Sequence, residues 1–297
     1  MIDKILEGPV KLLLALGARN KFPLSDKSYL KMRFKSKTGC KLSLKEPKTF
    51  NEKIQWLKLY DRRPEYIDMV DKYTVKQYVE KKIGKKYIIP TLGLWDKFED
   101  IDFEVLPEQF VLKCTHDSGG IVICRDKRFW NKSEAEKILT KSLKRNYYWL
   151  GREWPYKKIK PRIIAERYMT DESGKELKDY KIFTFHGVPR LIQVDFNRFI
   201  DHRRNMYTTD WEYIDMSIEF PTDSSCHIRR PKKLEEMLEL AAILSKGIPH
   251  VRVDFYSVDD HIYFGELTFY HGSGFERFTP EDWNYKLGEW IKLSKKD

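Results

Sequence analysis

The sequence predicts an α+β fold, in which helices and antiparallel hairpins share one chain. Residues 180–195 alternate between apolar and polar side chains around Gly187-Val188, and residues 251–269 do the same around Asp259-Asp260. Alternation about a short turn is typical of a β-hairpin. Apolar residues at helical spacing fill several segments before and between these hairpins. Helices mixed with adjacent hairpins are the pattern of the α+β class.

Size and charge set limits on what the protein can be. With 297 residues, the chain can form one large domain or two to three closely packed subdomains. Hydrophobic residues at 41% and aromatic residues at 14% argue against disorder. The net charge of +11 favours acidic partners such as nucleic acid, anionic lipid, phosphates or acidic polysaccharide. The basic residues are scattered, so most should form a solvated face.

The four cysteines are isolated from one another, which excludes the spacing of a zinc or thioredoxin-like motif. Reduced thiols of this kind fit a cytoplasmic protein. Near the N-terminus, residues 10–16 are apolar except for Lys11, and this run is too short to span a bilayer or serve as a signal peptide. We expect a docking helix here, and a weak membrane-surface helix is the alternative.

The first half of the chain is expected to be mostly helical. Residues 1–20 should form a helix, and residues 22–47, which are basic and rich in turn formers, should be irregular. Thr49 can cap the next helix because Glu52 follows three residues later. A further helix should begin at Asp71, with Val75, Tyr78 and Val79 on one face, and end at Gly84.

Strands and helices should then alternate irregularly. Residues 87–90, 110–113 and 163–166 read as short strands because they are apolar and bounded by polar or turn residues. Ser133 should cap a helix that runs to about Arg145. Pro231 should occupy the first turn of another helix, because proline suits that position.

The second hairpin carries a set of hard oxygen atoms. Side chains alternate along a strand, so Arg252 and Asp254 share one face, as do Glu266 and Thr268 on the partner strand. Two carboxylates suit Mg²⁺, and an adjacent arginine suits a phosphoryl group. The alternative is a solvent-facing charge pair, which the apolar neighbours disfavour.

Two further segments indicate an anion site. A strand delivers Lys113 and then runs into a glycine-containing loop, residues 118–120, whose backbone N–H groups could cradle phosphate. This is no P-loop, and an ordinary turn between strands is the alternative. Asp179 and Lys181 share a strand face, where they could bind a ribose hydroxyl and a phosphate; a surface ion pair is the other interpretation.

The order of these motifs resembles the TupA-like branch of the ATP-grasp superfamily, which is named for teichuronopeptide biosynthesis and occurs in surface-polysaccharide gene clusters. The likeness extends from about residue 28 to about residue 290. The segments that carry it are residues 50–56, 71–73, 110–120, 163–166, 179–181, 252–256 and 264–269.

The resemblance implies a nucleotide site bound by residues from both halves of the chain. The lysines that would hold or approach the ATP phosphates are Lys72, Lys113 and Lys181. Ser118, Gly119 and Gly120 would form the loop that closes over them. Glu166 would lie at the hinge beside adenine and Asp179 at the ribose.

The resemblance also implies a metal site and roles for the residues that would act in phosphoryl transfer and on the amine. Asp254 and Glu266 would be the Mg²⁺ ligands, and Arg252 would stabilise the transferring phosphoryl group and the acyl phosphate. Thr268 stands where the superfamily usually has asparagine, so a second Mg²⁺ would be held more weakly or through water. His116, in the loop, would act as a base for the amine or contact phosphate; otherwise it is a loop residue.

The resemblance predicts an ATP-grasp fold with an N-terminal helical region at residues 1–70, a possible acceptor-side domain, and two α+β subdomains at residues 71–165 and 166–297 that clamp ATP. The expected enzyme is a carboxylate–amine ligase that joins a uronic acid or amino acid to an amine, with an acidic glycan as a possible partner and no nucleic acid. The alternatives are a glycosyltransferase, a glycan- or nucleic-acid-binding protein, and an ATP-grasp kinase. For a glycosyltransferase, the carboxylate pairs at residues 100/102 and 210/212 offer no distinctive context.

Overall fold

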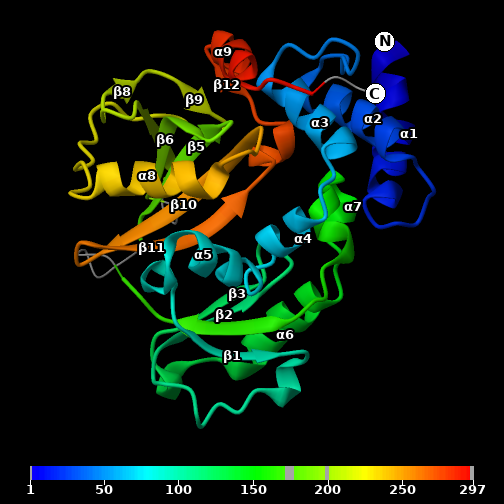
Figure 1. Cartoon of the computed structure of the whole chain (residues 1–297). Coiled ribbons are helices and arrows are strands. Elements are labelled where there is room, and N and C mark those ends of the chain that lie inside the picture. The colour runs from blue at the N-terminus through cyan, green and yellow to red at the C-terminus, as the bar shows by residue number, and fades with distance from the viewer. Residues whose placement is uncertain (1, 171–176, 198–200, 295–297) are drawn as a thin grey trace.

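The computed structural model describes residues 2–170, 177–197 and 201–294, and it divides them into two lobes built on two antiparallel sheets (Figure 1). The smaller sheet has the order β1-β4-β2-β3, and the larger has the order β11-β10-β5-β6-β7-β8. A two-stranded ribbon, β12-β9, adds to the larger lobe. Helices and antiparallel sheets are mixed, so the predicted α+β class is confirmed.

The helices lie mainly in the first quarter of the chain and beside the larger sheet. Their bounds are α1 (Ile2–Gly17), α2 (Asp26–Thr38), α3 (Phe50–Tyr60), α4 (Glu65–Val70), α5 (Val75–Ile83), α6 (Lys132–Leu143), α7 (Tyr148–Gly151), α8 (Leu234–Ser245) and α9 (Asp282–Trp290). None of the helices in the described part of the chain combines the length and apolar character that crossing a bilayer needs.

The strands of the smaller sheet are β1 (Thr91–Trp95), β2 (Phe110–Cys114), β3 (Ile121–Cys124) and β4 (Ile163–Arg167). Those of the larger lobe are β5 (Asp179–Phe185), β6 (Val188–Phe196), β7 (Arg203–Tyr207), β8 (Tyr213–Ile214), β9 (Ser217–Ile218), β10 (His250–Val258), β11 (His261–Thr268) and β12 (Phe278–Thr279). The expected boundary at residues 165/166 falls inside β4, which belongs wholly to the smaller sheet.

Several local predictions are confirmed. Thr49 caps α3 in a complete capping box, in which Glu52 N donates to Thr49 Oγ1 and Glu52 reaches back to Thr49 N. Gly84 ends α5. Both hairpins form: β5–β6 turns at His186-Gly187, one residue earlier than predicted, and β10–β11 turns at Asp259-Asp260. All four of these turn residues have positive φ, as type I′ turns require.

Other predictions are wrong. Residues 22–47 are not irregular throughout, because α2 occupies their middle, capped by Ser25 and buried through Tyr29, Leu30 and Phe34. Three apolar positions among many lysines were too few to reveal its period. Residues 87–90 form the end of a 3₁₀ turn and a single bridge, and the strand begins at Thr91. Asn131, not Ser133, caps α6, and α8 begins three residues after Pro231.

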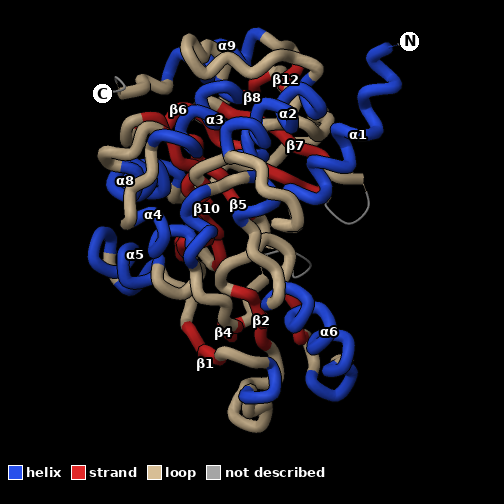
Figure 2. The backbone as a smooth tube through the Cα atoms, turned by 90° about the vertical axis from the view of Figure 1, so that its right-hand side faces the viewer, coloured by secondary structure: helices blue, strands red, loops and turns tan. Residues whose placement is uncertain are grey.

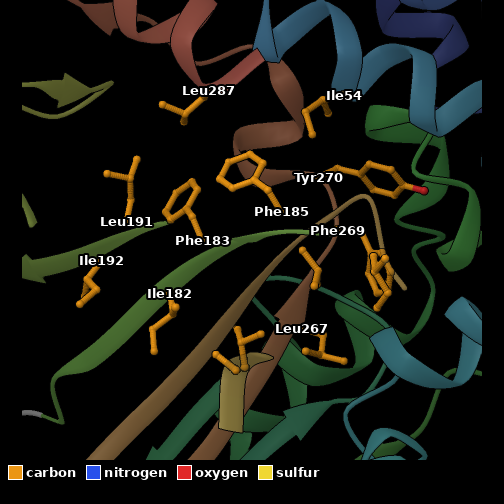
Figure 3. Close-up of a cluster of buried hydrophobic side chains, with 14 of the residues drawn as sticks. Ile54, Ile182, Phe183, Phe185, Leu191, Ile192, Leu267, Phe269, Tyr270 and Leu287 are labelled. Atoms are coloured by element: carbon orange, nitrogen blue, oxygen red, sulfur yellow. The ribbon is translucent and has the colours of Figure 1, made fainter. Parts of the chain in front are cut away.

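The larger sheet has two unlike faces. Apolar side chains of β5 and β10, such as Ile182 and Val253, pair in register and face α8. On the opposite face, one end of these strands is apolar: Phe183 and Phe185 lie beneath α3 and α9, where Figure 3 shows them with Ile54 and Leu287. Further along the same face the side chains become charged. The core therefore fixes the register that brings the charged groups together.

Because α9 packs closely on α3, we expect a larger side chain at Gly288 to destabilise the protein. A Cβ atom there would lie 2.2 Å from the carbonyl oxygen of Lys48, so the backbone must shift to admit it. We expect Gly288→Ala to lower the free energy of unfolding by about 2 kcal/mol, as overpacking does. The measurement is the urea midpoint. Gly8→Ala, in a helix with open space around it, is the matched control and should not lower the midpoint, because alanine favours a helix more than glycine does.

Candidate active site

Three of the predicted nucleotide residues, Lys72, Lys113 and Glu166, meet between the two sheets, where α4 and α5 also lie (Figure 1). A small cavity of about 80 Å³ separates the lobes there. It is lined by polar side chains from both lobes and by apolar walls: Lys72, Val75, Lys76, Ile88, Ile89, Lys113, Ile121, Glu166, Tyr256, Phe264, Gly265 and Glu266. Four of the predicted site residues therefore face one space, with an apolar wall that suits a purine base.

Glu166, on β4, is the carboxylate that the smaller lobe contributes to the cavity. Its two carboxylate oxygens lie 2.5 Å from Lys76 Nζ and 2.7 Å from Lys113 Nζ. Burial alone would raise the pKa of this carboxyl, but the charges of Lys113 and Lys76 lower it below its usual value. Lys76 was not predicted, although it follows Lys72 by one helical turn. Two ammonium groups held on one carboxylate form a cationic wall of the cavity.

Lys72 connects the turn between α4 and α5 to the glycine-containing loop. Its Nζ donates to the carbonyl oxygen of Asp117 at 2.5 Å, and its backbone N–H donates to that of Thr115 at 3.0 Å. The Asp117 carboxylate accepts from Ser142 Oγ and from Arg145. The loop that includes Ser118, Gly119 and Gly120 is thus attached to the C-terminal end of α6.

His116 lies behind this loop and is buried. Its Nε2 is 3.2 Å from the carbonyl oxygen of Ser142 and 3.0 Å from that of Arg145. Burial lowers the pKa of the ring. The structure therefore directs this ring toward α6, where it can hold the loop, and not toward the residues that line the cavity.

The β10–β11 hairpin brings its four polar side chains together in the predicted way. Arg252 pairs in register with Thr268, and Asp254 pairs with Glu266. Arg252 forms a bidentate pair with Asp254, with Nε and Nη2 each 2.7 Å from a carboxylate oxygen. Nη2 also lies 3.0 Å from Glu266 Oε1 and 3.1 Å from Thr268 Oγ1.

These oxygen atoms form a plausible donor set for Mg²⁺. The described residues contain no group of three or more histidine, cysteine, aspartate or glutamate side chains that could hold a metal on their own. Two carboxylates and a hydroxyl already surround one cation, the guanidinium of Arg252, and Mg²⁺ in phosphate-transfer sites commonly takes only one or two carboxylates, with phosphate and water as further ligands. The donor set therefore fits Mg²⁺ together with a bound phosphate.

Lys181 is held between two carboxylates, one from its own strand β5 and one from the neighbouring strand β6. Its Nζ lies 2.6 Å from Asp179 Oδ2 and 2.7 Å from Asp195 Oδ2. Asp195 also accepts from Arg204 Nε at 2.7 Å. Burial would raise the pKa of Asp195, but Lys181 and Arg204 hold it well below its usual value. Since Lys181 pairs with Asp254 in the sheet register, this cluster adjoins the β10–β11 hairpin.

A second buried chain of polar groups, which the sequence did not reveal, supports Arg252 from behind. Arg252 Nη1 lies 2.7 Å from His271 Nδ1. His271 Nε2 is 2.8 Å from Glu276 Oε2, and Glu276 lies 3.6 Å from Arg204. This chain and the Asp195 cluster meet at Arg204, so Arg252 and Lys181 are positioned by one continuous buried network.

The site predicts that Mg²⁺ affinity depends on pH. Burial raises the pKa of Asp254 to about 6, although Arg252 opposes the rise, and Glu266 adds to it. A protonated carboxyl is a poor ligand, so we expect Mg²⁺ affinity to increase as the pH rises through about 6. Titration of the protein with Mg²⁺ in buffers of increasing pH, with proton release recorded, measures this. An affinity that is flat across this range would contradict it.

Comparisons with known proteins show likeness at the level of family and fold. The family model described as TupA-like ATPgrasp matches residues 52–292. None of the curated proteins compared with the chain matches it. Among solved structures, a D-alanine–D-alanine ligase from Bacillus anthracis with ATP is 15% identical, with a TM-score of 0.40 over 68% of this chain and 53% of that one.

Two further structures are similar. A D-alanine–D-alanine ligase from Helicobacter pylori is 14% identical, with a TM-score of 0.43 over 82% of this chain and 69% of that one. An N5-carboxyaminoimidazole synthetase from Staphylococcus aureus with ADP is 15% identical, with a TM-score of 0.43 over 84% and 61%. The chain thus spans only about half the length of the Bacillus anthracis ligase.

Proposed function

The chain belongs to the TupA-like ATP-grasp family, and on this premise we propose that it is an Mg²⁺-dependent enzyme that uses ATP to join a carboxylate to an amine. The observation that carries the proposal is the cavity between the sheets, which lysines from both lobes line together with Glu266 of the β10–β11 hairpin. Such an arrangement suits a triphosphate and its metal ion.

Each side chain has a role that follows from its place. Lys72, Lys76 and Lys113 bind phosphate oxygens when ATP enters and displaces their present partners, Asp117 and Glu166. Ile121, Tyr256 and Phe264 contact the base. Glu166 and Asp179 accept hydrogen bonds from adenine and ribose. Ser118, Gly119 and Gly120 close over the phosphates, while His116 holds their loop against α6.

The chemistry has two steps. An oxygen of the donor carboxylate attacks the γ-phosphorus, and ADP leaves, so that an acyl phosphate forms. The amine then attacks the acyl carbon, inorganic phosphate leaves, and the amine loses a proton to solvent. Asp254 and Glu266, with Thr268 nearby, would hold Mg²⁺, which would supply neutralising charge for the phosphates. Arg252 and Lys181 stabilise the charge that develops during phosphoryl transfer.

The substrates rest on the resemblance. We propose a uronic acid or amino acid as donor and an amine as acceptor, in surface-polysaccharide biosynthesis in the cytoplasm. A net charge of +11 is compatible with an acidic glycan. We also propose that the smaller lobe, which begins near residue 89 and ends after β4, closes on the larger lobe, and that the N-terminal helices border the acceptor.

The test is a calorimetric titration with a non-hydrolysable ATP analogue and Mg²⁺, followed by a screen of carboxylates and amines for ADP release. We expect Lys113→Ala to weaken binding on the order of tenfold or more, because one charge-assisted contact is lost. Lys160→Ala, at an exposed ion pair, is the matched control. Free phosphate identifies a ligase, and phosphate retained on the substrate identifies a kinase. Absence of nucleotide binding would refute the proposal and favour the glycan-binding alternative.

A further inference from the structure

In the part of α1 whose side chains the structure describes, residues 8–17, one side of the helix is apolar and only partly covered by the rest of the fold. Leu12 is 61% exposed, and Leu13 and Leu16 are only partly buried. These positions follow helical spacing, and the spacing continues in the sequence through residues 2, 5 and 6. Figure 2 shows α1 at the periphery, with its N-terminal turns extending beyond the neighbouring elements. Exposed apolar side chains along one side of a helix indicate a binding surface.

The contact between α1 and the rest of the protein uses a different side of the helix. Leu14 and Ala18 pack against the larger core. Gly17 lies so close to α2 that a Cβ there would be 3.1 Å from the ring of Tyr29. The helix is therefore already anchored by these residues, and the stripe that contains Leu12 is left over.

The charge of the chain is concentrated beside this stripe. Residues 1–48 contain 12 lysines and arginines against 4 aspartates and glutamates, so they carry +8 of the total +11. On α2, Lys27, Lys31 and Lys35 follow one another by four residues and are exposed, whereas Tyr29 and Leu30 are buried. Within the described residues, none of these three lysines forms an ion pair with a carboxylate.

A row of like charges at this spacing destabilises a helix by itself. Its presence next to an apolar stripe is explained if both contact the same partner. We propose that α1 and α2 form a docking surface for a membrane that carries anionic lipids, with the stripe of α1 at the acyl boundary and the lysines of α2 at the headgroups.

Two other partners would fit the docking surface of α1 and α2 less well. A second copy of the chain would bring its own +8 charge to the interface and be repelled. An anionic polysaccharide would pair with the lysines but would leave Leu12 in water. A membrane surface satisfies both features without any spanning segment.

The test is co-sedimentation of the full chain with vesicles of phosphatidylcholine alone and with phosphatidylglycerol added. We expect binding only to the anionic vesicles, and weaker binding as salt increases. Changing Lys27, Lys31 and Lys35 together to Gln should weaken binding on the order of 100-fold, because each lysine near an anionic surface contributes. Leu12→Gln should weaken it roughly tenfold.

The matched control changes Lys137 and Lys141 of α6 and the C-cap residue Lys144 to Gln, which removes the same charge from another exposed surface. It should bind vesicles almost as wild type does. Unchanged thermal unfolding of every variant shows that folding is intact. Equal loss of binding in the control, binding to phosphatidylcholine alone, or self-association that Leu12→Gln abolishes would each overturn the proposal. So would retention on an acidic polysaccharide without binding to vesicles.

Discussion

Replacement of Arg252 by lysine should lower kcat for ADP formation on the order of 10³-fold, with little change in nucleotide affinity. The guanidinium contacts Asp254 at two atoms and reaches Glu266 and Thr268 with the same Nη2. A lysine is a point charge that cannot reproduce this planar fork. Because the interaction matters most when charge develops on the transferring phosphoryl group, the loss should fall on the rate and not on binding.

Steady-state kinetics and calorimetry of the Arg252→Lys variant separate the two effects. Arg229→Lys, at an exposed position, is the matched control and should retain the wild-type rate. If the loss of activity were less than tenfold, Arg252 would not stabilise the reaction. If nucleotide affinity fell in parallel with the rate, the residue would instead serve to bind the substrate or maintain the site.

Local sequence signals predicted the parts of this site that lie within one hairpin. Alternation along residues 251–269 places Arg252 and Asp254 on one face, and the register then brings Glu266 opposite Asp254. Counted from the turn alone, Asp254 would lie opposite Gly265, and a register shift between Asp254 and Phe255 brings Glu266 there instead. The sequence therefore predicted which side chains share a face, but not this irregularity. The capping box of α3 is predictable, since both of its members lie within four residues.

Contacts between distant segments could not be predicted in this way. The pairing of Asp195 with Lys181 and Arg204 depends on the register of three strands, and the position of His271 depends on how the chain folds back after β11. His116 was predicted from its place in the loop, but its direction is set by the carbonyl groups at the end of α6, which lie about 30 residues further along. Such contacts are decided by packing, which no single-segment pattern contains.

Asp195 is the residue whose loss should destabilise the protein most. It is buried, and it contacts Lys181 and Arg204, each at 2.7 Å. In the Asp195→Asn variant both cations stay buried without their common anion, although Lys181 keeps its contact with Asp179. Removal of one partner from a buried ion pair costs about 3–5 kcal/mol, so we expect a loss of this size in the free energy of unfolding. The measurement is urea unfolding at neutral pH.

Asp201→Asn is the matched control, because Asp201 pairs with Arg203 at the surface, where ion pairs contribute little. The pH dependence gives a second check. Lys181 and Arg204 depress the pKa of Asp195 in the folded protein, so its carboxylate stabilises the fold above the unfolded pKa of about 3.9, and this contribution is lost as the pH falls further. The difference between wild type and Asp195→Asn should therefore shrink in acid. A difference that stayed constant as the pH fell to about 2 would show that Asp195 acts through packing and not through its charge.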